Sequence, residues 1–124
     1  MHAIVVDDDD LIRTLLKRIL ERRRYTVTLY DKPGFCDECR CEIVGKCADV
    51  IISDVEMSDG NGLKLAQQQA QKGCQVEHHA LMSGAWTDEQ IQKAEALGWK
   101  IFPKPFEIDD LNNWLQECEK SLLG

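Results

Sequence analysis

The sequence has no long hydrophobic run: nothing in its 124 residues approaches the roughly 18 consecutive apolar residues that a membrane span requires. It also leaves no room for a signal peptide, because the segment Met1–Ile4 already enters a predicted strand. Internal repeats, linkers and low-complexity tracts are absent as well. We therefore expect a single cytoplasmic domain over residues 1–124, with no membrane partner.

Basic residues are in the minority, and the formal net charge is −7. A chain without a large basic face cannot neutralise many phosphates, which argues against direct binding to nucleic acids. The one basic cluster, Arg22–Arg24, lies at the predicted end of a helix, where positive charge interacts favourably with the helix dipole. We therefore interpret this cluster as structural.

Short apolar runs alternate with segments of helical periodicity along the chain. The strands expected from this pattern cover residues 3–6, 25–30, 50–53, 79–82 and 99–102, and the helices cover 10–24, 61–72, 87–97 and the segment from Ile108 to Leu122. Strands that alternate with helices predict a parallel sheet covered on both faces. Right-handed crossovers would then bring the carboxyl ends of all five strands to one edge.

Polar side chains follow four of these strands: Asp7 and Asp8, Asp54, Ser83 and Lys104. Three converging carboxylates would repel one another, and a bound divalent cation would remove that repulsion. Carboxylate oxygens together with water suit Mg²⁺. Lys104 would add a cation and Ser83 a hydroxyl donor, and this combination suits the oxygens of a phosphoryl group.

The whole pattern resembles the receiver domain of two-component response regulators, and the match covers nearly all of the chain. Val5-Val6-Asp7-Asp8 is similar to the family's acidic pair, and Arg13 stands at the usual spacing in the first helix. Asp54, within Ile-Ile-Ser-Asp-Val-Glu-Met, matches the aspartate that accepts a phosphoryl group. Ser83, within Leu-Met-Ser-Gly, matches the family's hydroxyl residue. Lys104-Pro105-Phe106 is similar to the family's lysine motif, whose Lys–Pro bond is usually cis.

The resemblance implies an α/β fold of the flavodoxin-like type, a doubly wound five-stranded parallel sheet in a (βα)₅ arrangement. It implies that Asp54 accepts a phosphoryl group from a sensor histidine kinase or a phosphotransfer protein. Mg²⁺ would be held by Asp8, Asp54 and the backbone carbonyl of Glu56, and Asp7 would contribute through water.

The resemblance also implies how the signal leaves the site. Lys104 and Ser83 would bind the aspartyl phosphate, and Phe102 would turn inward behind Ser83. This motion would alter the surface formed by the fourth helix, the fifth strand and the fifth helix. Such a protein is a phosphoryl acceptor rather than an enzyme, because it catalyses only its own phosphorylation and dephosphorylation. It would signal through protein contacts without an output domain, and a homodimer formed on phosphorylation stays open.

Two residues near Asp54 depart from the family pattern. Ser58 stands where the family usually has proline, which would make this loop less rigid. Glu56 places a carboxylate two residues beyond Asp54. Its side chain either points to solvent, or competes for Mg²⁺ or orients water and so changes the lifetime of the phosphoryl group.

The larger departure covers residues 31–49, where receivers usually have their second helix. Cys36, Cys39, Cys41 and Cys47 crowd into this segment. Four nearby thiols match the ligand number of a structural Zn²⁺ site, but the tight Cys39-x-Cys41 spacing and the missing paired Cys-x-x-Cys motifs do not. Bound Zn²⁺ or another soft metal, a redox-responsive thiol cluster and unligated thiols all stay open.

Two other functions compete with a receiver. The strand followed by Asp7-x-Asp9 loosely resembles the opening motif of haloacid dehalogenase-type phosphatases, with Asp7 as nucleophile, although Leu11 replaces the expected threonine or valine. A metal- or redox-sensing binding module could instead keep the fold and signal through its cysteines. The phosphatase would be labelled at Asp7, the receiver at Asp54, and the binding module would not respond to phosphodonors.

Overall fold

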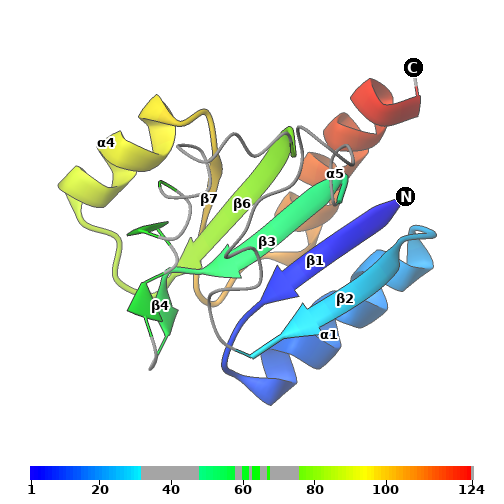
Figure 1. Ribbon diagram of the computed structural model, residues 1–124, viewed down its shortest axis with the longest axis horizontal. Helices are drawn as coiled ribbons and strands as arrows, with labels where there is room; N and C mark the ends of the chain where they lie inside the picture. Colours follow the sequence, from blue (N-terminus) through cyan, green and yellow to red (C-terminus); the bar gives the residue numbers. More distant parts are fainter. Residues whose placement is uncertain (32–47, 58–59, 62, 65–66, 68–75, 124) are drawn as a thin grey trace, which may run out of the picture.

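The computed structural model describes residues 1–31, 48–57, 60–61, 63–64, 67 and 76–123. Five strands form a sheet in the spatial order β2-β1-β3-β6-β7 (Figure 1). They are β1 (His2–Val6), β2 (Thr26–Tyr30), β3 (Val50–Asp54), β6 (His78–Ser83) and β7 (Lys100–Pro103). All neighbouring strands in this sheet run parallel, so the predicted doubly wound, flavodoxin-like α/β fold is confirmed.

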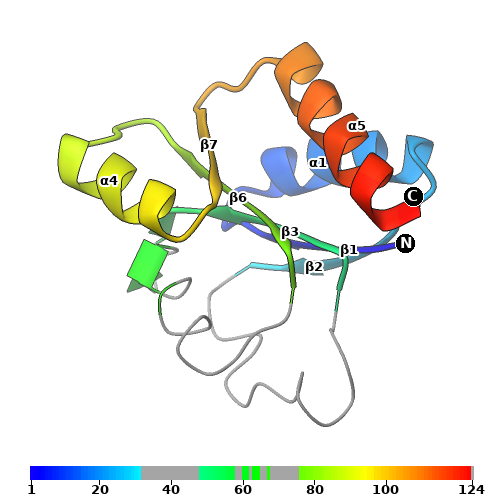
Figure 2. The same ribbon diagram turned by 90° about the horizontal axis from the view of Figure 1, so that it is seen from above.

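Helices α1 (Asp10–Arg22) and α5 (Ile108–Leu123) lie on one face of the sheet (Figure 2). Their buried side chains recur at helical spacing and are Leu16, Ile19 and Leu20 in α1 and Leu111, Leu115 and Cys118 in α5. These side chains pack against Val5, Ile52 and Met82 of the sheet in the main hydrophobic core. The burial of this apolar surface is what holds the two helices against the strands.

Helix α4 (Asp88–Ala96) packs on the opposite face. Ala94 of α4 shares a second core cluster with Leu81 of β6 and Ile101 of β7. Successive strand residues point to opposite faces, so Leu81 meets α4 while its neighbour Met82 meets the core under α1 and α5. The sheet is therefore covered on both faces, as the sequence predicts.

The helix ends follow from local side chains. Asp9 caps α1, because its carboxylate accepts hydrogen bonds from the backbone N–H groups of Leu11 and Ile12. Thr87 caps α4 in a reciprocal pair with Gln90. Gly98 ends that helix with a φ of 74°, a left-handed conformation that favours glycine.

Several predicted features lie outside the described residues. They include the cysteines of the proposed metal site (Cys36, Cys39, Cys41 and Cys47), Ser58 and most of the predicted helix 61–72. Within the described residues, β4 (Glu56–Met57) and β5 (Gly60–Asn61) form a small antiparallel pair that the sequence pattern did not predict. Among the helices of the described ranges, none combines the length and apolar character needed to cross a membrane.

Candidate functional site

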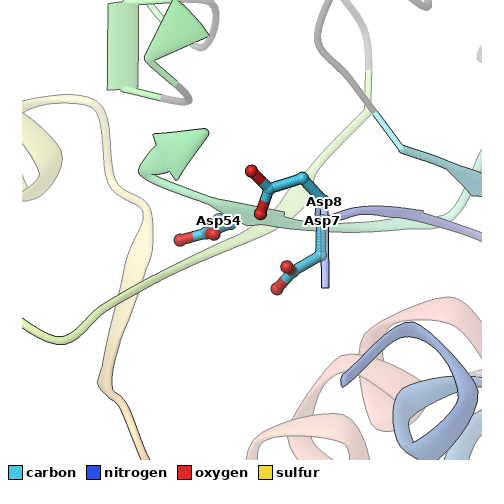
Figure 3. Close-up of side chains that lie close together, drawn as sticks. All are labelled: Asp7, Asp8 and Asp54. Atoms are coloured by element: carbon cyan, nitrogen blue, oxygen red, sulfur yellow. The ribbon is translucent and has the colours of Figure 1, made fainter. Parts of the chain in front are cut away.

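Three carboxylates gather at the carboxyl edge of the sheet, where the strand order reverses between β1 and β3. Asp7 and Asp8 follow β1, and Asp54 ends β3 (Figure 3). One carboxylate oxygen from each of them lies within 4.8 Å of the others. Asp7 and Asp54 are almost fully buried, at 1% and 4% exposure, while Asp8 is exposed. The structure thus brings together the three acids that the sequence placed at strand ends.

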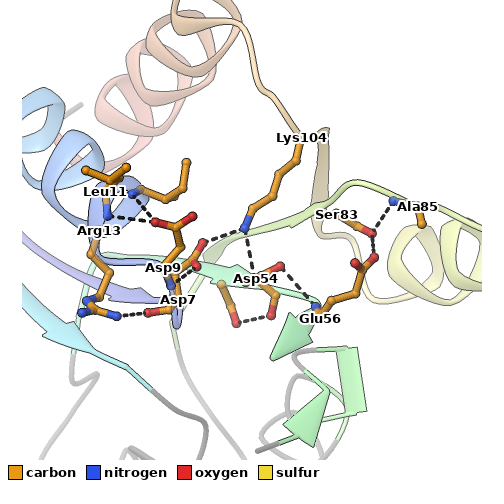
Figure 4. Close-up of polar contacts among 11 residues, drawn as sticks. Asp7, Asp9, Leu11, Arg13, Asp54, Glu56, Ser83, Ala85 and Lys104 are labelled. Carbon is orange, nitrogen blue, oxygen red and sulfur yellow. Dashed lines mark hydrogen bonds and ion pairs between the residues drawn. The ribbon is translucent and has the colours of Figure 1, made fainter. Parts of the chain in front are cut away.

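Lys104 links two of these acids from the loop after β7 (Figure 4). Its Nζ lies 2.9 Å from Asp7 Oδ2 and 3.1 Å from Asp54 Oδ2. Its backbone N–H donates to the carbonyl of Ser83 at 2.9 Å, which ties the loop to the end of β6. The Lys104–Pro105 peptide bond is cis, as the lysine motif led us to expect.

The charges of the site perturb one another. Burial raises the pKa of Asp54 above its ordinary value; the charge of Asp7 adds to this, and the hydrogen bond from Lys104 opposes it. Burial lowers the pKa of Lys104, but its contacts with Asp7 and Asp54 outweigh this and leave that pKa above its ordinary value. Lys104 is therefore held as a cation, and it offsets part of the repulsion between the two buried acids.

Backbone and side-chain hydrogen bonds hold the acids in place. Asp7 Oδ1 accepts from the backbone N–H of Asp9 at 2.9 Å, and Arg13 Nη1 donates to the carbonyl of Asp7 at 2.6 Å. Asp54 Oδ1 accepts from the backbone N–H of Glu56 at 3.1 Å. The family pattern predicted the position of Arg13 in the first helix, and the structure shows that its side chain contacts the carbonyl of Asp7.

The donor set fits a hard divalent cation. Three carboxylates supply oxygen ligands, which Mg²⁺ prefers over nitrogen or sulfur. The exposed Asp8 leaves one side of the cluster open to the water molecules that Mg²⁺ normally retains.

Ser83 and Glu56 form a contact that the sequence reasoning missed. The Ser83 hydroxyl donates a hydrogen bond to Glu56 Oε1 and accepts one from the backbone N–H of Ala85 at 3.0 Å (Figure 4). The Glu56 side chain is exposed, as one of the two expectations has it, and it accepts this hydrogen bond as well. The pairing of β3 with β6 could have suggested the contact, because it sets Asp54 opposite Met82 and so brings the residues beyond them together.

The side chains of Phe102 and Ser83 point to opposite faces of the sheet. The Phe102 ring is 2% exposed and packs in the main core, edge-on to Trp114 with ring centroids 5.9 Å apart. Phe102 pairs with Met82 in the sheet, so both side chains point to the face covered by α1 and α5. Ser83, one residue on, points to the other face. The inward turn of Phe102 behind Ser83 on phosphorylation stays a prediction, and it would require this ring to leave the core.

Comparisons with known proteins agree with this geometry. The family model described as the response regulator receiver domain matches residues 3–116. The DNA-binding transcriptional regulator NtrC of Salmonella typhimurium is 29% identical over 106 residues, which are 86% of this chain and 22% of that protein. The two-component response regulator ARR10 of Arabidopsis thaliana is 31% identical over 126 residues, covering 99% of this chain and 22% of that protein. This chain thus spans about a fifth of the length of these relatives.

Solved structures show the same fold. The chemotaxis response regulator CheY4 of Vibrio cholerae is 25% identical, with a TM-score of 0.72 over 94% of this chain and 97% of that chain. A response regulator receiver protein from Pseudoalteromonas atlantica has a TM-score of 0.81 at 15% identity, over 98% of this chain and 99% of that chain. At the latter identity the likeness concerns the fold alone.

Proposed function

Because the chain belongs to the family of response regulator receiver domains, we propose that Asp54 accepts a phosphoryl group from a phosphohistidine of a sensor histidine kinase or a phosphotransfer protein. The observation that carries this proposal is the position of Lys104, whose ammonium group contacts both Asp7 and Asp54 within a cluster of three carboxylates. A buried carboxylate beside a fixed cation at the open edge of the sheet is well placed to attack phosphorus.

In the proposed transfer, an oxygen of Asp54 forms a bond to phosphorus while the bond from phosphorus to the histidine nitrogen breaks. The imidazole leaves, and Asp54 becomes an acyl phosphate. Lys104 would exchange its contact with the Asp54 carboxylate for one with a phosphoryl oxygen. The Ser83 hydroxyl would donate a hydrogen bond to another phosphoryl oxygen. The protein would therefore act as a phosphoryl acceptor that assists its own modification.

Asp8, Asp54 and the backbone carbonyl of Glu56 would hold Mg²⁺ in this site, and Asp7 would contribute through water. The ion, when bound, supplies positive charge to the phosphoryl oxygens. Asp7 is also held by Lys104 and by the backbone of Asp9, so its main part is to fix the position of the lysine.

The signal would pass to the surface formed by α4, β7 and α5. The loop after Ser83 reaches β7 through Trp86, whose Nε1–H donates to the carbonyl of Phe102 at 2.8 Å. A displacement of Ser83 toward the phosphoryl group would therefore act on β7 through this loop. We propose that a downstream protein reads the altered surface.

Mass spectrometry after treatment with acetyl phosphate and Mg²⁺ tests the proposal. Wild type should gain a phosphoryl group of about 80 Da on Asp54. The Asp54→Ala variant should gain none, and the control Asp109→Ala, which changes an exposed acid on α5, should be labelled like wild type. An adduct on Asp7 would instead support a phosphatase of the haloacid dehalogenase type. The contacts already made by both Asp7 oxygens argue against that outcome.

A further inference from the structure

The proton of the Ser83 hydroxyl is already in use in this structure. Ser83 is 1% exposed, and its oxygen donates to Glu56 Oε1 while it accepts from the backbone N–H of Ala85. A serine hydroxyl carries a single proton and can donate only one hydrogen bond at a time. The carboxylate of Glu56 therefore occupies the one donor that Ser83 has.

The same donor is needed at Asp54 if the proposed function holds. Ser83 ends β6 and Asp54 ends the adjacent strand β3, so the hydroxyl lies at the edge where the phosphoryl group would be attached (Figure 4). Glu56 is involved twice, because its backbone N–H donates to Asp54 Oδ1 while its side chain accepts from Ser83. Its side chain and a phosphoryl group on Asp54 would compete for one proton.

We propose that Glu56 is a positioning residue that holds the Ser83 hydroxyl in the unphosphorylated state and releases it when Asp54 is phosphorylated. This inference rests on the proposed function and deepens it. Two features favour release. The phosphoryl group brings negative charge next to the Glu56 carboxylate and repels it. Glu56 is exposed, so its carboxylate can exchange the hydroxyl for water.

This competition stabilises the unphosphorylated protein relative to the protein phosphorylated on Asp54. A hydrogen bond to a charged group typically contributes about 1.5 kcal/mol, which corresponds to about a tenfold change in an equilibrium constant. Removing the Glu56 acceptor should therefore increase the affinity for a phosphoryl mimic by about tenfold, and it should do so only when Ser83 is present.

A double-mutant cycle tests this dependence. Beryllofluoride, which mimics a phosphoryl group on aspartate, is titrated at saturating Mg²⁺, and binding is followed by tryptophan fluorescence. The proteins are wild type, Glu56→Ala, Ser83→Ala and the double variant. Glu95→Ala is the matched control, because it removes an exposed glutamate on α4. Circular dichroism confirms that each variant is folded.

We expect Glu56→Ala to bind beryllofluoride about tenfold more tightly than wild type. In the Ser83→Ala background the same substitution should tighten binding by only about twofold, the part due to relieved charge repulsion, because the contested proton is gone. Glu56→Gln, which keeps an oxygen acceptor without the charge, should give an intermediate affinity. Glu95→Ala should match wild type.

Equal tightening with and without Ser83 would show a general charge effect and overturn the inference. Unchanged or weaker binding by Glu56→Ala would overturn it as well. A failure of the proposed function looks different: wild type itself would neither bind beryllofluoride nor be labelled on Asp54 by acetyl phosphate. If wild type is labelled normally but the effect of Glu56→Ala on beryllofluoride affinity does not depend on Ser83, only the role of Glu56 is refuted and the proposed function stands.

Discussion

Lys104 reaches across the end of β6 to place its Nζ 3.1 Å from Asp54 Oδ2 on β3. The strand order puts β6 between β3 and β7, so this ion pair joins strands that are not neighbours. It also lies in a largely buried setting, with the side chain of Asp54 only 5% exposed. A charge pair of this kind is costly to break from one side, because the partner is left buried and uncompensated.

Replacing Lys104 with methionine should separate metal binding from phosphoryl recognition. Without the ammonium group the acidic cluster becomes more negative, so the affinity for Mg²⁺ should stay the same or increase. The affinity for beryllofluoride should fall by tenfold or more, on the order of one lost charge-assisted hydrogen bond. Titrations followed by tryptophan fluorescence measure both affinities.

Lys120→Met is the matched control for this substitution, because Lys120 is an exposed lysine of α5 that pairs with Glu117. It should leave both affinities unchanged. Equal beryllofluoride affinity in Lys104→Met and wild type would contradict the assigned role of the lysine.

Magnesium should stabilise the folded protein through Asp8. A ligand present at ten times its dissociation constant, and bound only by the folded state, raises the free energy of unfolding by about 1.4 kcal/mol. Asp8→Ala should lose this gain, because it removes one of the three clustered carboxylates that could hold the ion. Thermal melts with and without Mg²⁺, at equal ionic strength set with NaCl, measure the effect. A metal-dependent gain that survives in Asp8→Ala would place the ion elsewhere.

The site residues that the sequence predicted are those fixed by topology. Asp7, Asp54 and Lys104 each follow an apolar strand, and the parallel arrangement alone brings such positions to one edge. That these three residues lie close together can be predicted without knowing any side-chain conformation. The pairing of Lys104 with Asp7 and Asp54 is therefore accessible from strand order and residue type.

The features that the sequence did not give depend on which way a side chain points. The lysine motif predicts where Phe102 lies along the chain. The face of the sheet to which its side chain points follows from the alternation of β7 and from its pairing with Met82. The contact between Glu56 and Ser83 depends on a rotamer of an exposed side chain. No local pattern of apolar and polar residues specifies the contact between Glu56 and Ser83, because it results from packing between segments far apart in sequence.

Trp86 should report on the loop that follows Ser83. Its indole N–H donates to the carbonyl of Phe102, so Trp86→Phe removes a hydrogen bond worth about 1 kcal/mol to the free energy of unfolding. Urea denaturation measures this loss. The same substitution should abolish most of the fluorescence change caused by beryllofluoride, whereas Trp114→Phe should keep it. A full fluorescence change in Trp86→Phe would show that the loop does not move with the site.

His79 should make the stability of the protein depend on pH between about 4 and 6.5. The ring is 5% exposed and stacks on Trp99 with centroids 3.7 Å apart. Burial lowers its pKa from 6.5 to about 4, the charge of His78 lowers it further, and a hydrogen bond with the carbonyl of Val76 opposes both. The folded state therefore keeps the ring neutral over a range in which the unfolded chain already binds a proton.

The sign of the effect follows from this difference in proton binding. The contribution of His79 to stability is complete above pH 6.5 and is lost as the pH falls toward 4, because protons then favour the unfolded chain. The loss should amount to about 3 kcal/mol over this range. His79→Phe keeps an aromatic ring against Trp99 but cannot titrate, so its free energy of unfolding should decline less steeply below pH 6.5. Urea denaturation at a series of pH values compares the two proteins, and the other titrating groups cancel because they are common to both. Parallel curves would mean that water reaches the ring of His79 and that its burial does not control its charge.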